Sequence, residues 1–335
     1  MKKKYYLGID VSKKKLDMCL MAESKILKEE TISNSMEMIE SSILELQSEF
    51  SFTKQELLIC CEHTGGYTYP LRCVSYSLEI ALWVENPTQI KLSNGMQRGK
   101  NDRIDAQRIA MYASRFEDKA HVGGLHEKKL EELKELLCEQ DLLVVDRAKY
   151  KAQLSDQGDY MDKKVWANKS KRLQSLISAL DKVINDIQNQ IEDIINNDEK
   201  LYRQMQLLKS VDGIGDKTAL KMIIETGSFK DFTNPRKFCC HAGVAPFSYN
   251  SGASIRSKTQ VSKRANKSIK TLLHLAALSI LRKKGELQDY YHRKLAEGKS
   301  KMTVINAIRA KLVYRMFAVI KNNKFYQPIY LNSLA

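Results

Sequence analysis

Two carboxylates three residues apart stand at the start of a predicted helix. Asp102 and Asp105 belong to the stretch KNDRIDA, residues 100–106, which leads into the helical pattern DRIDAQRIAMYASRF. At this spacing both side chains lie on one face of the helix, and two close carboxylates repel each other unless a cation or a proton lies between them. The pair is therefore a candidate cation site. The alternative is an ordinary first turn, where the helix dipole favours acids.

Two more acids follow predicted strands. Residues 4–10, KYYLGID, form a strand pattern that ends in Asp10. Residues 57–61, LLICC, are a wholly apolar run typical of a strand buried on both faces, and Glu62 follows them. Further strands are predicted over residues 15–21, 26–32 and 80–84, and helices over residues 35–49 and 69–78.

This order of elements, a three-stranded meander followed by α/β crossovers, indicates a ribonuclease-H-like domain over residues 1–120. In such a fold Asp10 and Glu62 lie at the carboxyl ends of neighbouring strands, where ligand sites in α/β sheets gather. The helix after them can place Asp102 and Asp105 alongside. Four carboxylates suit Mg²⁺, and two such ions about 4 Å apart can stabilise the attacking and leaving oxygens of a phosphodiester. The alternative is that Asp10 and Glu62 are unrelated strand-end acids.

Residues 125–208 form a nearly continuous helical pattern without proline. Apolar residues such as Leu173, Ile177 and Ile184 recur at three-four spacing, and residues 157–162 are the predicted turn. We therefore expect an antiparallel coiled-coil hairpin over residues 125–205 that pairs subunits. Basic residues near its tip either contact nucleic acid or form a solvated face. They are Lys149, Lys151, Lys163, Lys164, Lys169, Lys171 and Arg172.

Residues 206–335 are predicted to form a mainly helical domain. Residues 207–223 place V-D-G-I-G between two helices, a helix-hairpin-helix pattern whose backbone N–H groups can approach a phosphate. The alternative is a corner that only packs. A short helix is expected over residues 236–243, then a loop over 244–252 that exposes Ser248 and Ser251. A helix capped by residues 262–266 should run through residue 281, and residues 289–317 are predicted to be basic helix.

The positive charge is concentrated in the last quarter of the chain. The net charge is +15, and residues 250–335 carry this whole excess, with 18 Lys and Arg against 3 Asp and Glu. Such a surface is typical of nucleic-acid binding, and an anionic membrane is the weaker alternative. Aromatic residues interspersed with these bases are expected in the core rather than as base-stacking platforms. They are Tyr290, Tyr291, Tyr314, Phe317, Phe325 and Tyr326.

The remaining composition argues against a membrane or a zinc protein. No apolar run reaches the length of a membrane span, and the start MKKKYYLGID lacks a signal-peptide core, so we expect a cytoplasmic protein with no membrane partner. The seven cysteines are scattered without a C-x-x-C pair. We therefore expect reduced, mostly buried thiols and no zinc site.

Ser251 and Gly252 precede a run of basic residues. A loop serine is a poor nucleophile at neutral pH unless a base, a metal or a strong electrophile assists it, and Ser-Gly is also a common turn sequence. The neighbouring cations could hold and polarise a DNA phosphate. These candidate nucleic-acid-binding residues are Arg256, Lys258, Lys263, Arg264, Lys267 and Lys270.

Taken in order, these motifs resemble those of the bacterial insertion-sequence transposases with an Asp-Glu-Asp-Asp active site. That family is related to the Piv invertase and comprises bridge-RNA-guided recombinases. The motifs that carry the resemblance span almost the whole chain. They are GIDVS at 8–12, EHTGG at 62–66, KNDRIDA at 100–106, VDGIG at 211–215, AGVAP at 242–246, SG at 251–252 and SKR at 262–264.

The resemblance implies a RuvC-type N-terminal fold, a coiled-coil dimerisation element and a C-terminal transposase domain with a serine nucleophile. It implies that Asp10, Glu62, Asp102 and Asp105 hold Mg²⁺, with Mn²⁺ as a substitute, and that Ser251 is the nucleophile. Family members form homodimers that assemble into homotetramers with a structured noncoding guide RNA. Loops of that RNA pair with double-stranded donor and target DNA. The serine makes a covalent phosphoserine link in an active site shared between subunits, in the bacterial nucleoid.

The departures from the family pattern are small. Ala265 stands where the family commonly has glycine, and residues 247–250 are variable, so Ser248 and Ser254 remain alternative nucleophiles. Two other functions stay open. One is a RuvC-like Holliday-junction resolvase or nuclease, in which the four carboxylates activate water without a covalent step. The other is a basic nucleic-acid scaffold that dimerises through residues 125–208 and has no catalytic activity.

Overall fold

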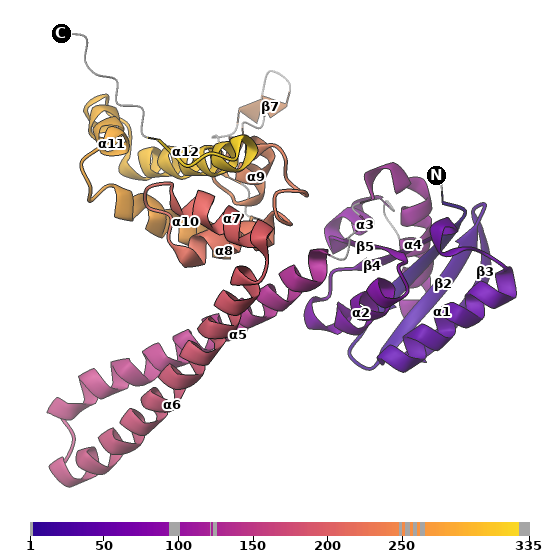
Figure 1. Cartoon of the computed structure of the whole chain (residues 1–335), viewed down its shortest axis with the longest axis horizontal. Coiled ribbons are helices and arrows are strands. Elements are labelled where there is room, and N and C mark those ends of the chain that lie inside the picture. Colours follow the sequence, from indigo (N-terminus) through magenta and orange to yellow (C-terminus); the bar gives the residue numbers. More distant parts are fainter. Residues whose placement is uncertain are drawn as a thin grey trace. The chain divides into compact units, whose positions relative to one another are not determined.

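The computed structural model of the chain describes residues 3–93, 101–120, 122, 126–247, 250–251, 255–256, 260–261 and 265–327. These residues form two compact units, Met1–Lys128 and Lys129–Ala335. The first is an α/β unit built on one sheet, and the second is almost entirely helical (Figure 1).

A five-stranded mixed sheet forms the centre of the N-terminal unit, with the strand order β3-β2-β1-β4-β5. Strands β1 to β3 are an antiparallel meander, and β4 and β5 run parallel to β1. The predicted strands and their ribonuclease-H-like order are therefore present. The strands are β1 (Tyr5–Val11), β2 (Lys15–Ala22), β3 (Lys25–Ser33), β4 (Leu57–Glu62) and β5 (Ala81–Glu85).

Helices cover both faces of the sheet because alternate side chains of each strand point to opposite faces. Leu7 and Ile9 of β1 pack in one core with α1 and α2. Tyr6 packs on the other face, in a core that contains Ile109 and Tyr112 of α4. The helices are α1 (Met36–Phe50), α2 (Tyr69–Ser77), α3 (Pro87–Ser93) and α4 (Asp102–Arg115), and 3-10 turns lie at Lys54–Glu56, Gly65–Thr68 and Glu117–Lys119.

Helix α4 approaches strand β1 closely at Gly8. A Cβ atom at this position would overlap the backbone nitrogen of Ala110 and the carbonyl oxygen of Ala106. Glycine is required here for its missing side chain, because a methyl group would push the helix off the sheet. This contact sets the depth at which α4, and therefore Asp102 at its first turn, lies over the sheet.

Two long helices open the C-terminal unit as an antiparallel hairpin (Figure 1). Helix α5 (His126–Asp156) and helix α6 (Lys163–Asn196) are joined by a 3-10 turn at Gln157–Asp159, where the turn was predicted. Side chains bridge them: Gln140 donates to Gln188 over 2.9 Å. The predicted helical run to residue 208 is wrong at one point, because α6 ends at Asn196. Asp198 then caps a separate helix by accepting from the Leu201 N–H.

The remaining helices pack around one apolar core, which also takes in the base of the hairpin. Gly213 adopts φ +81° in the turn between α7 and α8, within the predicted V-D-G-I-G pattern. The prediction of basic helix over residues 289–317 is wrong in its boundaries, because Gly298 adopts φ +79° and Ser300 caps a new helix. These elements are α7 (Glu199–Lys209), α8 (Asp216–Glu225), α9 (Pro235–His241), α10 (Lys267–Ile280), α11 (Glu286–Ala296) and α12 (Lys301–Asn322).

The segment predicted as a loop around Ser251 contains short antiparallel strands. Strand β6 (Pro246–Phe247) pairs with β9 (Gln260–Val261), and β7 (Asn250–Ser251) pairs with β8 (Ile255–Arg256). Two-residue strands leave no periodic pattern in a sequence, so the loop prediction could not detect them. Within the described part of the chain, no helix is both long and apolar enough to cross a membrane.

Candidate functional site

A row of carboxylates crosses four strands at one end of the sheet. Asp10 on β1 is paired with Asp17 on β2, and Glu62 on β4 is paired with Glu85 on β5. The β1–β4 register brings Glu62 next to Asp10. Residues in register on neighbouring strands point to the same face. The four acids therefore share the face that α4 covers.

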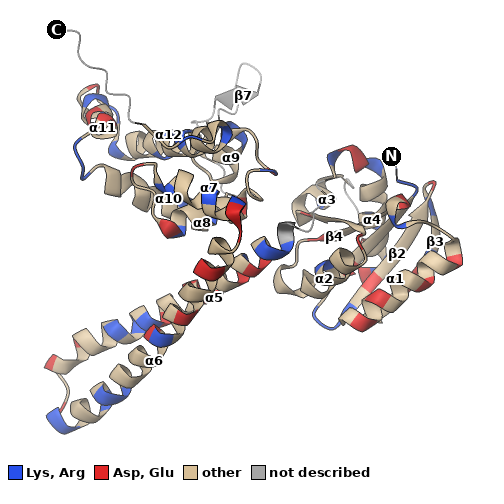
Figure 2. Ribbon diagram, viewed as in Figure 1, with Lys and Arg blue, Asp and Glu red and all other residues tan. Residues whose placement is uncertain are grey.

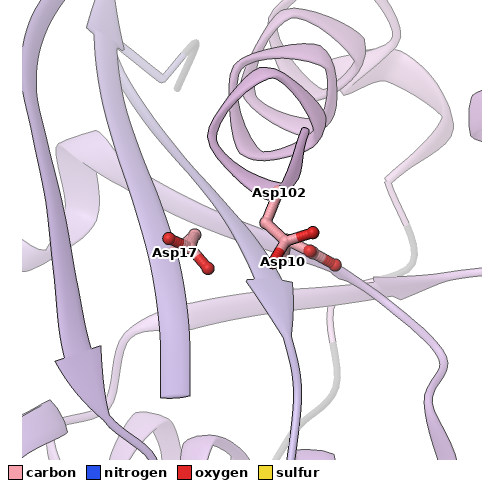
Figure 3. Close-up of side chains that lie close together, drawn as sticks. All are labelled: Asp10, Asp17 and Asp102. Carbon is pink, nitrogen blue, oxygen red and sulfur yellow. The ribbon is translucent and has the colours of Figure 1, made fainter. Parts of the chain in front are cut away.

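Three carboxylates converge at this end of the sheet. One ligand oxygen from each of Asp10, Asp17 and Asp102 lies within 4.8 Å of the other two. Figure 3 shows these three side chains close together, two from adjacent strands and one from the start of α4. The backbone fixes Asp102 locally, because the Asn101 side chain caps α4 by accepting from the Arg103 N–H over 3.2 Å.

Asp17 is the buried member of this cluster, with 6 % of its surface exposed. Thr31 Oγ1 donates to Asp17 Oδ1 over 2.7 Å, and Lys15 Nζ lies 2.9 Å from Asp17 Oδ2. Burying a polar group is costly unless hydrogen bonds or ion pairs such as these compensate for the lost water. The sequence analysis did not select Asp17. The available signal was its position opposite Asp10 across the β1–β2 hairpin, which becomes visible only once the register is known.

Lys15 is an internal counter-ion of the cluster. Its ammonium lies 2.9 Å from both Asp17 Oδ2 and Asp102 Oδ2. Hydrogen bonds to Asp102 and Asp17 raise the pKa of Lys15 above its usual value. A single ammonium offsets only part of the charge of three carboxylates. Oxygen donors in this number and spacing therefore fit a hard divalent cation.

The other two predicted ligands lie beside the cluster. Asp105 Oδ1 is 2.6 Å from Arg108 Nη1, an ion pair within the first turns of α4. Glu62 lies in the strand row next to Asp10. Glu85 at the end of the row has structural partners, since it accepts from Tyr112 Oη over 3.1 Å and from the Asn86 N–H over 2.6 Å. Burial, together with Glu85, raises the pKa of Tyr112, which therefore stays protonated as the donor.

The predicted serine site is described only in its backbone. Ser251 pairs with Ile255 in the β7–β8 ladder. Lys267 and Lys270 lie in the first turn of α10, whose N-terminus is capped by the Asn266 side chain. The predicted residues Ser248, Ser254, Lys258, Lys263 and Arg264 lie outside the described residues, as do the side chains of Ser251 and Arg256.

Comparison with protein families finds two matched regions. Residues 7–159 match the DEDD profile of the IS110 group, described as "Transposase", and residues 205–292 match the profile described as "Transposase IS116/IS110/IS902 family". One profile covers the sheet, α5 and the turn after it. The other covers the last part of α7, all of α8 to α10 and most of α11.

Individual relatives agree with these regions. The chain is similar to the pilin gene-inverting protein of Moraxella bovis, with 25 % identity over 96 % of this chain and 97 % of that protein. It is 24 % identical to the insertion element IS110 uncharacterized 43.6 kDa protein of Streptomyces coelicolor, over 46 % of this chain and 37 % of that protein. Among solved structures, T. thermophilus RuvC in complex with Holliday junction substrate aligns with 36 % of this chain and 99 % of its own, at 15 % identity and a TM-score of 0.29.

Proposed function

We propose a mechanism for this chain from the premise that it belongs to the IS110/IS116/IS902 transposase family, whose transposases and DNA invertases cleave and rejoin DNA. The chain acts as an RNA-guided transposase on double-stranded DNA. A divalent cation and a serine nucleophile carry out the strand exchange. The observation that carries the proposal is the convergence of Asp10, Asp17 and Asp102 from two strands and a helix.

The carboxylate cluster is the proposed cation site. Asp10, Asp17 and Asp102 would hold Mg²⁺, or Mn²⁺ in its place, because hard cations prefer oxygen donors. When bound, the cation supplies positive charge to the oxygens of the phosphodiester. Glu62 beside Asp10 and Asp105 one turn along α4 remain proposed members of the site. Lys15 keeps the acids from repelling one another until the cation arrives.

Ser251 is the proposed nucleophile of the covalent step. Its hydroxyl oxygen forms a bond to the phosphorus of the scissile phosphodiester, and a deoxyribose oxygen leaves with a proton. The reverse attack by a deoxyribose hydroxyl of another strand rejoins the DNA and returns the proton to the serine. The basic residues that follow Ser251 would hold the phosphate. They are Arg256, Lys258, Lys263, Arg264, Lys267 and Lys270.

The test is strand cleavage of a supercoiled plasmid that carries the recombination site, with trapping of protein–DNA adducts. Ser251→Ala should remove both the covalent adduct and the cleavage. Ser248→Ala and Ser254→Ala are matched controls and should keep both activities. Cleavage retained by Ser251→Ala without a protein–DNA adduct would reject the serine mechanism. That outcome would favour the alternative, a resolvase or nuclease with metal-activated water, for which the converging carboxylates alone suffice.

A structured noncoding RNA is the proposed guide. The support is the resemblance to guided family members together with the concentration of positive charge in residues 250–335. RNA that copurifies with the protein should be one discrete species encoded beside the gene, and random cellular RNA would contradict the proposal. If the basic region contacts phosphates, nucleic-acid affinity should fall steeply with salt. Binding to chromosomal DNA would then place the protein at the nucleoid.

The hairpin of α5 and α6 is the proposed dimerisation element, with dimers assembling into tetramers. Leu142 and Val145 on α5 are 62 % and 53 % exposed, and Leu176 and Val183 on α6 are also exposed. Apolar residues on the outer face of a two-helix hairpin are buried when a second hairpin packs there. Light scattering should show a multimer that the pair Leu142→Glu and Val145→Glu dissociates. Lys149→Glu on the same helix is the control, and a monomeric parent protein would reject the proposal.

Basic residues also occur along the hairpin toward its turn (Figure 2). Some are balanced by acids of the same hairpin: Arg147 Nη1 lies 2.6 Å from Asp181 Oδ1, and Lys149 Nζ lies 2.8 Å from Asp146 Oδ1. The positive charge of the hairpin surface around these two ion pairs is therefore partly neutralised. Contact with nucleic acid is more plausible for the lysines at the start of α6, such as Lys163 and Lys164.

A further inference from the structure

An open groove of about 1010 Å³ lies in the C-terminal unit, between helices α9 and α12 and the paired strands β6 and β9. Ala245, Pro246 and Val261 line one side of it, and Pro246 pairs with Val261 where β6 meets β9. Strand β7, which carries Ser251, follows β6 a few residues later in the chain. One wall of the groove therefore belongs to the stretch of chain that carries the proposed nucleophile.

The charge of the groove is entirely positive among the described residues that line it. Arg236 of α9, Lys270 of α10 and Arg309 of α12 contribute the cations, and these lining residues include no acid. An electropositive concave surface attracts an anionic ligand and repels cations.

Arg309 is an unusual cation, because it is buried without a carboxylate. It is 5 % exposed. Its Nη2 lies 2.6 Å from His274 Nδ1, and its Nη1 lies 3.5 Å from Asn306 Oδ1. Neither partner is an acid, and the second distance is at the long limit of a hydrogen bond. Its Nε has no hydrogen-bond partner among the described residues. A buried charge is costly unless it is paired, so this guanidinium retains an unused capacity to bind an anion.

Burial also disfavours the charge of Arg309, since it lowers the pKa of the guanidinium.

The Asn306 amide is engaged elsewhere, because its Nδ2 donates to the Val244 carbonyl over 2.7 Å. That bond ties α12 to the segment that leads into β6. Helix α12, which carries Arg309, is thus joined to the segment before β6 through the Asn306 side chain.

Apart from Thr303 and Asn306, the other lining residues are mostly apolar, and one aromatic ring is exposed. Ala307 and Ala310 of α12 leave room beside Arg309, and Tyr314 is 47 % exposed at one end. Tyr314 was expected in the core, so its exposure differs from the prediction. An aromatic ring beside cations is the arrangement that binds unpaired nucleotides, because a base stacks on the ring and its phosphate meets the charge.

We propose that this groove binds a single strand of DNA, with a phosphate on Arg309 and a neighbouring base on Tyr314. The inference rests on the proposed function, since the strand is the one processed at Ser251. Single-stranded DNA is favoured over a duplex because only an unpaired base offers its face for stacking. DNA is favoured over RNA because Pro246 in the groove wall lies only five residues before Ser251, the residue proposed to cleave DNA.

Fluorescence polarisation of the full-length protein tests the proposal in EDTA, so that no cation or cleavage step is involved. The probes are a labelled 12-nucleotide DNA strand, its duplex and the RNA strand of the same sequence. Arg309→Gln should weaken DNA-strand binding about tenfold to a hundredfold, the range for a hydrogen bond to a charged group. Tyr314→Ala should weaken it about tenfold. Lys25→Ala removes an exposed charge outside this groove and outside the basic region, and should change it less than about twofold.

A second exposed variant protects the test against misfolding of the buried arginine. Arg236→Ala changes a solvent-exposed side chain and should weaken binding several-fold in a protein that melts like the parent. The proposal is overturned if folded Tyr314→Ala and Arg236→Ala bind the DNA strand as the parent does. It is also overturned if these variants lose only RNA or only duplex binding. Cleavage by Ser251→Ala without a protein–DNA adduct would reject the serine mechanism and leave this binding result unaffected, so the two failures are distinguishable.

Discussion

The acidic cluster of the N-terminal unit and the basic groove of the C-terminal unit each gather charge of one sign. The charge is negative in the cluster and positive in the groove. Asp10, Asp17 and Asp102 are held by strand register and a helix start, and Lys15 offsets part of their charge. Arg309 is held by helix packing, and its described partners include no acid. The first site is suited to a cation and the second to a phosphate.

The two sites also differ in the features that position their side chains. The acids depend on backbone features, namely β1–β2 pairing and the approach of α4 at Gly8. The groove depends on side chains from α9, α10 and α12 that are far apart in the sequence. Substitutions in the backbone frame should therefore damage the acidic site in an all-or-none manner, whereas groove substitutions should act in graded steps.

The largest effect is expected from the acids themselves. Asp10→Asn or Asp102→Asn should lower DNA cleavage on the order of a hundredfold to a thousandfold, because each removes charge that the proposed cation requires. Plasmid cleavage in Mg²⁺ measures this. Asp118→Asn, which changes an exposed acid outside the cluster, should leave it unchanged. Full activity of both cluster variants would remove the metal site and support the scaffold alternative.

Gly8→Ala tests whether backbone contact positions the cluster. The added methyl group overlaps the backbone of α4, so unfolding free energy should fall by about 1–3 kcal/mol and Asp102 should move away from Asp10. Urea denaturation and Mn²⁺ binding measure the two effects. Gly66→Ala is the control, because a Cβ there meets nothing within 4 Å. Equal stability of the two variants would contradict the close approach.

Asp17→Asn against Asp105→Asn tests which acid completes the site. Asp17 lies in the three-carboxylate cluster, whereas Asp105 pairs with Arg108. Asp17→Asn should weaken Mn²⁺ binding about tenfold to a hundredfold, and Asp105→Asn should weaken it less. Titration calorimetry measures both. The reverse order would restore Asp105 as the principal ligand and assign Asp17 a structural role.

Lys15→Met tests the internal counter-ion. Without the ammonium, the carboxylates of Asp17 and Asp102 lose a competitor for the cation, so Mn²⁺ should bind several-fold more tightly. Without metal the variant should melt at a lower temperature than the parent. Mg²⁺ should remove this difference in melting temperature. Lys14→Met, an exposed neighbour, is the control. Weaker cation binding by Lys15→Met would show that the lysine assembles the site rather than competes for it.

The smallest effect is expected from the pH dependence of stability at His274, the hydrogen-bond partner of Arg309. Burial and the nearby Arg309 charge lower the pKa of His274 from 6.5, so the folded protein favours the neutral ring that accepts from Arg309. The unfolded chain takes up this proton first as pH falls, so the stabilisation is complete above pH 6.5 and is lost toward lower pH. Melting temperatures between pH 8 and pH 5 should fall less for His274→Gln than for the parent. Identical pH profiles would show that His274 does not contribute.

Much of the N-terminal site could be predicted because its signals are local. Strands β1 and β4 appear as short apolar runs, with Asp10 next to the last residue of β1 and Glu62 as the last residue of β4. Asp102 begins a helix that Asn101 caps. Asp17 was missed because its pattern is that of an ordinary strand residue. It joins Asp10 only through the hairpin register, which pairs residues on opposite sides of a turn.

The groove could not be predicted for the same physical reason, acting over longer distances. Arg309 is one of many basic residues on an apolar helix, and a helical pattern does not show that its only close partners are His274 and Asn306 among the described residues. The break between α11 and α12 also went unpredicted, although Gly298 and Ser300 lie at it. Packing between helices that are distant in sequence decides which cations are exposed and which are buried.

The sequence by itself indicated the secondary elements of the sheet, the hairpin turn, the concentration of positive charge and four acids in or beside the cluster. These acids are Asp10, Glu62, Asp102 and Asp105. These features depend on alternation, capping and composition, which act within a few residues. Only the tertiary structure decided that Asp17 joins Asp10 and Asp102, that Asp105 turns to Arg108, and that Arg309 is buried without an acid. Register and helix packing set these outcomes, because they bring together residues whose separation along the chain carries no local signal.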